Sequence, residues 1–269
     1  MSRIAKAFAR RLGLGGKSFV PFLPLGFPSL AASASLIVDL DRAGADILEL
    51  GLPFSDSLAD GPTIQHAYHQ ALAAGVTVGA ALDLVAEVRP KLEAPIVLMC
   101  CYNLIHKMGI LPFAARARQA GIDGVIAPDL PLEESEPLRR ELDHSGIDLI
   151  GLVSPTTPLS RAVRISRASS GFVYYISRKG VTGVGGEVSD EVAQAITALR
   201  SRTSRPVVVG FGISSPAQAA VVARGADGVI VGSALVDLLS AHPAGEGGRL
   251  LVELAHEFRR ALGGAQASR

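Results

Sequence analysis

The sequence predicts a single α/β domain, a (β/α)8 TIM barrel with an additional N-terminal helix. Eight short apolar runs recur along the 269 residues, helical patterns separate them, and glycine-rich turns follow the late runs. Strands that alternate with helices pair in parallel, and strands that are apolar throughout are buried on both faces. Eight such units in about 250 residues match a barrel. An open doubly wound sheet is the alternative, but its glycine fingerprint would follow the first strand.

The elements can be assigned in chain order. A basic amphipathic segment, 1–16, is expected to form a short helix packed under the barrel. The segments between strands are rich in alanine, leucine and arginine, and examples are 31–44 and 131–146. We expect one domain over 1–262 and a disordered tail over 263–269. The strand candidates are 18–26, 45–51, 94–100, 123–129, 148–154, 171–177, 206–212 and 227–233.

Composition excludes several classes of function. The formal net charge is +1 and the charges are scattered, so we expect no nucleic-acid partner. No apolar run is long enough to span a membrane, and the N-terminus lacks the apolar core and cleavage site of a signal peptide. Cys100 and Cys101 are adjacent in the sequence, so a disulfide between them is not expected. They are typical of small residues that pack at a strand end. The absence of an expected disulfide fits a reducing cytoplasm.

Three late loops predict a phosphate site. They are 177–183, 210–215 and 231–235, which follow the sixth, seventh and eighth strand candidates. Their glycines let backbone amides approach an oxyanion, and two of them open helices whose N-termini favour negative charge. Barrels often bind phosphate after strands seven and eight, so we expect these loops to converge on one phosphate group.

Carbon–carbon cleavage usually needs an electron sink, commonly a Schiff-base lysine or a metal ion. The sequence shows no clear candidate for either. No lysine falls within a strand candidate, and Lys179 lies on a loop. No histidine lies at a strand end, and His66 with His69 on one helical face is typical of surface or packing positions rather than a metal site. The substrate would then supply its own sink, as an indole ring does when its C3 carbon is protonated.

Two carboxylates suit that chemistry. Glu49 stands in an apolar strand end, where desolvation should raise its pKa and make it an acid/base, although a buried ion pair with an arginine is the alternative. Asp60, on a wetter loop, should stay ionised and accept the ring N–H, unless it only caps the turn at Gly61-Pro62. Asp56 follows Ser55 and can equally bond within its own loop.

These residues and their neighbours resemble one known family along essentially the whole chain, the α subunits of tryptophan synthase. The resemblance rests on seven motifs that are specific together and in this order: FVPFLPLGFP, AGADILELGLPFSDSLADGPTIQ, AGVT, DLPLEES, SRKGVTG, GFGISS and GSALV. The resemblance implies a barrel lyase that cleaves indole-3-glycerol phosphate to indole and glyceraldehyde 3-phosphate.

The resemblance also implies roles for individual residues. Glu49 would protonate indole C3 and take the proton of the neighbouring glycerol hydroxyl, while Asp60 would stabilise the positive ring nitrogen. Tyr174 matches an active-site tyrosine, although strand packing is the alternative for its hydroxyl. Asp56 and Thr182 match loops that close over the substrate and signal to the partner. The matched substrate-binding positions are Phe22, Thr182, Gly183, Phe211, Gly212, Gly232 and Ser233, of which the phenylalanines could equally be core.

The family implies a partner as well. The partner beta subunit would carry pyridoxal phosphate in an αββα tetramer and receive indole internally, and this chain itself would hold no cofactor and no metal. The alternatives are a stand-alone lyase, a weakly active allosteric partner of the beta subunit, and another phosphate-binding barrel enzyme such as a sugar-phosphate isomerase. The missing lysine and histidine at strand ends count against the last of these.

Two positions depart from the family pattern. Ser57 replaces a usual proline, which should loosen the loop that holds Asp60, because serine restricts the backbone less. Cys101 replaces a usual tyrosine, so the aromatic wall near the indole should be thinner or be rebuilt by Tyr102.

Overall fold

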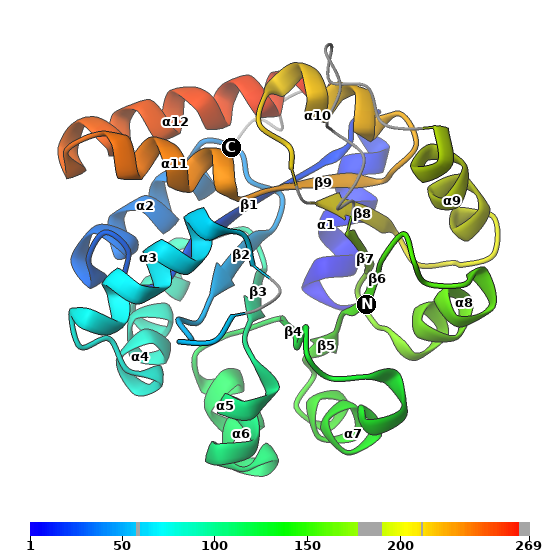
Figure 1. The fold of residues 1–269 in the computed structure, drawn as a ribbon, viewed down its shortest axis with the longest axis horizontal. Coiled ribbons are helices and arrows are strands. Elements are labelled where there is room, and N and C mark those ends of the chain that lie inside the picture. The colour runs from blue at the N-terminus through cyan, green and yellow to red at the C-terminus, as the bar shows by residue number, and fades with distance from the viewer. Residues whose placement is uncertain (58–59, 177–189, 211, 264–269) are drawn as a thin grey trace.

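A ring of parallel strands forms the centre of the molecule, and helices surround it (Figure 1). The structure is a computed structural model that describes residues 1–57, 60–176, 190–210 and 212–263. All eight strand candidates are confirmed in position. The strands are β1 (Ser18–Pro24), β2 (Leu48–Gly51), β3 (Ile96–Met99), β4 (Gly124–Ile126), β5 (Asp148–Leu149), β6 (Gly151–Val153), β7 (Val173–Ile176), β8 (Val207–Gly210) and β9 (Gly228–Val231).

The ring closes through one divided strand, which differs from the single strand predicted over 148–154. β5 pairs with β4 and β6 pairs with β7, and these two strands are the ends of the order β5-β4-β3-β2-β1-β9-β8-β7-β6. Only Ile150 separates them, so the chain changes partners within one strand. The change occurs at Gly151, where a Cβ would lie 2.4 Å from the Ser169 hydroxyl oxygen and 2.6 Å from Ile165.

The outer layer confirms the predicted alternation of strands and helices. The predicted segment 131–146 is shorter as a helix than expected, because its first turn is a separate 3-10 helix, η2 (Leu132–Glu134). The other 3-10 helix is η1 (Arg89–Lys91). The α-helices are α1 (Arg3–Gly13), α2 (Leu30–Arg42), α3 (Pro62–Ala73), α4 (Val78–Val88), α5 (Tyr102–Met108), α6 (Ile110–Gln119), α7 (Glu136–His144), α8 (Leu159–Ala168), α9 (Asp190–Arg200), α10 (Pro216–Ala223), α11 (Ser233–Ala241) and α12 (Ala244–Ala261).

The N-terminal helix covers one end of the ring, as the sequence predicted. α1 lies within the outline of the strands when the barrel is viewed along its axis (Figure 1). Its Ile4 and Phe8 are buried, and the Phe8 ring lies 5.8 Å from that of Phe172. Ile4 also approaches Gly124, where a Cβ would be 2.8 Å from its Cδ1. This end carries the N-terminal ends of the strands and leaves the other end open for a site.

A buried ion cluster ties the chain ends together at the covered end. Asp46 accepts hydrogen bonds from the Phe19 amide at 2.9 Å and from Arg259 of α12 at 2.5 Å. Arg11 of α1 lies 3.9 Å from the same carboxylate, and its Nε donates to the Lys17 carbonyl. Burial lowers the pKa of Arg259 to about 10, against the opposing attraction of Asp46. The fold therefore uses its buried arginines here, away from the open end.

The described residues contain no single helix that is long and apolar enough to cross a membrane. The pair Pro62–Ala73 and Val78–Lys91 meets that criterion only when joined, and it is bent by 100° at the break.

Candidate active site

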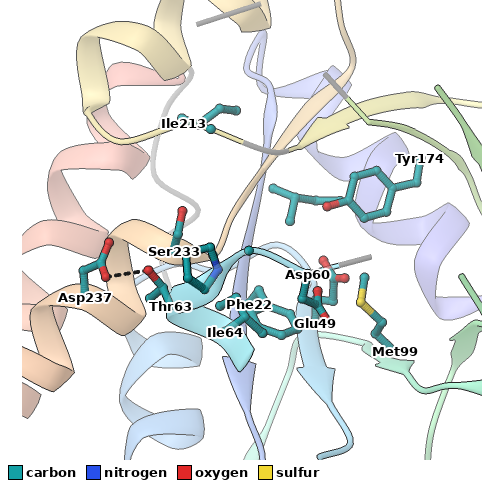
Figure 2. A pocket seen from close by; sticks show the side chains of 15 residues that line it. Phe22, Glu49, Asp60, Thr63, Ile64, Met99, Tyr174, Ile213, Ser233 and Asp237 are labelled. Atoms are coloured by element: carbon teal, nitrogen blue, oxygen red, sulfur yellow. Dashed lines mark hydrogen bonds between the residues drawn. The ribbon is translucent and has the colours of Figure 1, made fainter. Parts of the chain in front are cut away.

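A cavity of about 340 Å³ opens at the carboxyl ends of the strands. Strands β1, β2, β3, β7 and β9 contribute side chains to it, and so do the loops that follow β2, β8 and β9 (Figure 2). All the predicted site residues that the structure describes line this one cavity: Phe22, Glu49, Asp60, Tyr174, Gly212, Gly232 and Ser233. The predicted Thr182, Gly183 and Phe211 lie outside the described residues.

Glu49 is buried and has no partner for its carboxylate in the described part of the chain. It is 1% exposed, and neither carboxylate oxygen has a hydrogen bond to a described residue. Desolvation and, as the smaller cause, the negative charge of the nearby Asp60 together raise the pKa of Glu49 to about 8. The expected rise of the pKa is therefore confirmed, and the alternative of an arginine ion pair does not hold among the described residues. A carboxyl group with such a pKa can give and take a proton near neutral pH.

Asp60 lies beside Glu49 but on the loop that leads into α3 (Figure 2). It is half-buried, and its amide donates to the Ser57 carbonyl at 3.1 Å. The Gln65 side chain donates to the carbonyls of both Ser57 and Asp60 at 3.1 Å each. These bonds fix the backbone of Asp60 relative to Ser57 and α3. The loosening expected from Ser57 stays a prediction, because 58–59 lie outside the described residues.

Asp56 forms a hydrogen bond within its own loop, which is one of the two interpretations of this residue. The Ser55 hydroxyl donates to its carboxylate at 2.7 Å, so Asp56 is bonded within its own exposed loop. Asp56 also lines a second cavity, described below, and not the cavity that holds Glu49.

Tyr174 directs its hydroxyl from β7 into the same space as the two carboxylates (Figure 2). The hydroxyl lies over Gly210 of β8, where a Cβ would be only 2.4 Å from it. Burial raises the pKa of Tyr174 well above its ordinary value, and Glu49 and then Asp60 add to the rise. Tyr174 is therefore a neutral hydrogen-bond donor at neutral pH.

The opposite side of the cavity suits an oxyanion. Gly232 precedes α11, no side chain caps that helix, and Ser233 is its first residue. Gly212 has a φ of +74°, which favours glycine, and it stands shortly before α10. Backbone amides at a helix N-terminus together with glycines that leave room beside them are suited to bind phosphate. The structure thus brings two of the three predicted phosphate loops to one cavity.

Sequence reasoning missed several residues of the cavity. Met99 ends β3, so the rule that strand ends face the site could have found it. Thr63 and Asp237 also line the cavity, and the Thr63 hydroxyl donates to the Asp237 carboxylate at 2.8 Å, which links α3 to α11 (Figure 2). No sequence pattern pairs residues 174 positions apart.

A second cavity of about 460 Å³ adjoins the first and shares Asp60 and Met99 with it. Tyr68 and Cys101 are among its lining residues. The Cys101 thiol donates to Asp129 at 2.7 Å. Tyr102 is absent from the described lining of both cavities, and its ring contacts His106 at 6.2 Å. Of the two alternatives for the aromatic wall, the described linings agree with a thinner wall rather than one rebuilt by Tyr102.

Three further features concern the thiols, the histidines and metal-binding groups. Cys100 and Cys101 are both free thiols. His66 and His69 are exposed on α3. Within the described ranges, no group of three or more histidine, cysteine, aspartate or glutamate side chains could hold a metal ion.

Comparisons with known proteins agree with one another. A family model described as "Tryptophan synthase alpha chain" matches residues 8–261. The tryptophan synthase alpha chain of Gloeobacter violaceus is 47% identical over 260 residues, covering 96% of this chain and 94% of the relative. That of Geobacter sulfurreducens is 48% identical, covering 98% and 100%.

Solved structures give the same result. Tryptophan synthase from M. tuberculosis, in an aminoacrylate-bound form, superposes with a TM-score of 0.87 at 33% identity, covering 97% of this chain and 100% of the other. The tryptophan synthase subunit alpha of Legionella pneumophila superposes with a TM-score of 0.89 at 35% identity, covering 97% and 98%.

Proposed function

Because the chain belongs to the tryptophan synthase alpha chain family, we propose how its own residues perform that family's reaction. The chain is a carbon–carbon lyase, the alpha subunit of tryptophan synthase. It cleaves indole-3-glycerol phosphate to indole and glyceraldehyde 3-phosphate. The observation that carries the residue assignment is the buried carboxyl group of Glu49, which has no partner among the described residues and whose pKa burial and Asp60 raise to about 8.

The reaction begins with the neutral form of Glu49. Its carboxyl proton passes to indole C3, and the ring nitrogen becomes positive. Asp60, on the half-buried loop beside Glu49, accepts the ring N–H and stabilises that charge. The Glu49 carboxylate then takes the proton of the glycerol hydroxyl next to the ring. The carbon–carbon bond breaks, its electron pair returns to the ring, and indole and the aldehyde result with Glu49 protonated again.

The remaining residues bind and orient the substrate. Tyr174 supplies a neutral hydroxyl beside Glu49. Phe22 packs at the ring of the substrate, since it is the register partner of Glu49 on the neighbouring strand. Gly212, Gly232 and Ser233 hold the phosphate. Thr182, Gly183 and Phe211, which lie outside the described residues, are proposed for the same substrate on the resemblance alone.

The family implies a beta-subunit partner for this chain. We propose an αββα tetramer in which indole passes directly to the beta subunit. Pyridoxal phosphate would belong to the beta subunit and not to this chain, and the assembly would be cytoplasmic. Residues 1–262 are proposed to act as one domain.

The direct test is indole release from indole-3-glycerol phosphate by the purified chain, with and without a tryptophan synthase beta subunit. We expect slow release alone and a sharp rise when the beta subunit is added. Fast release by the chain alone would support a stand-alone lyase instead. Release that stays weak in both conditions would support a role mainly as an allosteric partner, and the absence of indole in both would overturn the proposal.

The pKa of Glu49 predicts the pH dependence of the reaction. The first step needs the protonated carboxyl group, so kcat should hold from neutral pH to about pH 8 and fall as Glu49 ionises above it. A pH–rate series over the neutral and alkaline range measures this. A profile that is flat through pH 8 and beyond would contradict the acid role of Glu49.

The same pKa predicts a change in stability. In the unfolded chain Glu49 has its ordinary pKa of 4.5, so between pH 4.5 and about 8 the folded chain binds one proton more. The contribution of Glu49 to the free energy of unfolding must therefore decrease as the pH rises through this window. Denaturant unfolding of the wild type and of Glu49→Gln over a pH series isolates the contribution of Glu49 to the free energy of unfolding, because glutamine does not titrate. The free energy of unfolding of the glutamine variant, relative to that of the wild type, should increase as the pH rises from 4.5 to about 8.

A further inference from the structure

The sequence-derived site contains one tyrosine, Tyr174, but the structure places a second tyrosine hydroxyl beside the carboxylates. Tyr68 is on α3 and is 2% exposed. It lines the second cavity, which shares Asp60 and Met99 with the cavity that holds Glu49. No motif named it, because a tyrosine on an amphipathic helix is normally a core residue.

The position of the Tyr68 hydroxyl is fixed by a glycine. A Cβ added at Gly51 would lie 2.2 Å from that hydroxyl oxygen and 2.7 Å from the Phe22 ring. Glu49 and Gly51 are two residues apart on β2, so their side-chain positions lie on the same face of the strand. Tyr68 therefore fills, from outside the strand, the place next to Glu49 that a side chain at position 51 would occupy.

Acidic groups surround this hydroxyl. Burial raises the pKa of Tyr68 well above its ordinary value, and Asp60, Glu49 and Cys100 raise it further, in that order. The same cavity also contains Asp56, Cys101 and Asp129. Tyr68 therefore stays neutral and keeps its proton. This neutral hydroxyl can therefore donate a hydrogen bond to a carboxylate that turns toward it.

We propose that Tyr68 is a positioning residue of this active site, whose hydroxyl donates a hydrogen bond to the Asp60 carboxylate and keeps it ionised and directed at the ring nitrogen of the substrate. The assignment rests on the proposed function. Tyr68 reaches Asp60 from α3, while Glu49 has no hydrogen-bond donor among the described residues. A neutral donor on one carboxylate favours its charged form and leaves the other as the acid.

The test compares Tyr68→Phe with a matched control, Tyr175→Phe, in the full chain bound to a tryptophan synthase beta subunit. Tyr175 is next to Tyr174 on β7, is 2% exposed, and has a buried hydroxyl without a partner in the described residues. Its hydroxyl is on the other face of β7 and lines a different cavity, between α8 and α9. Both variants keep the ring and lose one buried oxygen.

For Tyr68→Phe we expect kcat to fall about tenfold, the effect of one hydrogen bond to a charged group. The acidic limb of the pH–rate profile should move up by about one pH unit, because Asp60 loses the donor that favours its ionised form. Binding of inorganic phosphate and the melting temperature should stay at the wild-type values. Tyr175→Phe should match the wild type in rate and in pH profile.

Three outcomes would overturn the role of Tyr68. They are a wild-type kcat and pH profile in Tyr68→Phe, an equal loss of rate in Tyr175→Phe, and a rate loss explained by weaker phosphate binding. A wild-type chain that releases no indole would overturn the proposed function itself. An active wild type, an inactive Glu49→Gln and an unchanged Tyr68→Phe would overturn the tyrosine assignment alone.

Discussion

Glu49→Gln should lower the rate of indole release by about 10³-fold. Glutamine keeps the size of the side chain but can neither give a proton to C3 nor take one from the glycerol hydroxyl. The amide also fits the buried position, since Glu49 has no partner there to lose among the described residues. The affinity for a phosphate ligand should survive, because Gly232 and Ser233 act on the other side of the cavity. Indole release and phosphate binding are measured on the same preparation.

The matched control for this variant is Asp237→Asn. Asp237 is a carboxylate of the same cavity, but it comes from α11 and is bonded by Thr63. Its loss should change the rate far less than the loss of Glu49. Equal losses of chemistry and of phosphate affinity in Glu49→Gln would remove Glu49 from the acid/base role.

The second large effect concerns stability. Asp46→Asn should lower the free energy of unfolding by about 3 to 5 kcal/mol, because it removes the carboxylate that pairs with the buried guanidinium group of Arg259 and lies near that of Arg11. For a chain of this size the melting temperature should fall by about 10 °C. Denaturant and thermal unfolding measure the change. The asparagine side chain can still accept the hydrogen bond from the Phe19 amide. The substitution therefore mainly removes the negative charge of Asp46.

A surface pair provides the control for the effect of burial. Glu133 accepts two hydrogen bonds from Arg161, both at 2.8 Å, but both side chains are exposed. Water and salt screen such a pair, so Glu133→Gln should change stability little despite its better geometry. If the two variants were equally destabilised, the special cost of breaking the Asp46 cluster would be refuted.

The order and place of the strands could be predicted from the sequence. Each strand candidate is a local apolar run that is bounded by turn residues, and a parallel barrel buries both faces of every strand. The exception is the strand at 148–154, which is divided at Ile150, next to Gly151, where Ile165 of α8 and Ser169 just after that helix pack closely. Local patterns contain no information about that contact.

The candidate site was predictable to a similar extent. Glu49, Asp60 and Tyr174 stand at or just after strand ends, and the topology of a barrel brings such positions to one opening. The resemblance to a family added the roles, and the burial of Glu49 was visible in its apolar neighbours. The choice between a thinner aromatic wall and one rebuilt by Tyr102 could not be made from the sequence, because it depends on the direction of α5, whose first residue, Tyr102, packs near His106.

The sequence by itself therefore determined which residues lie at the open end of the barrel and which are apolar, because strand alternation and turn chemistry are local. Only the tertiary structure decided which charges meet. In the folded chain Arg11 and Arg259 lie beside Asp46 at the covered end, and Glu49 has no counter-ion among the described residues. It also brings Tyr68 over Gly51. Pairings of this kind depend on distances between residues far apart in the chain, and those distances exist only once the ring of strands has closed.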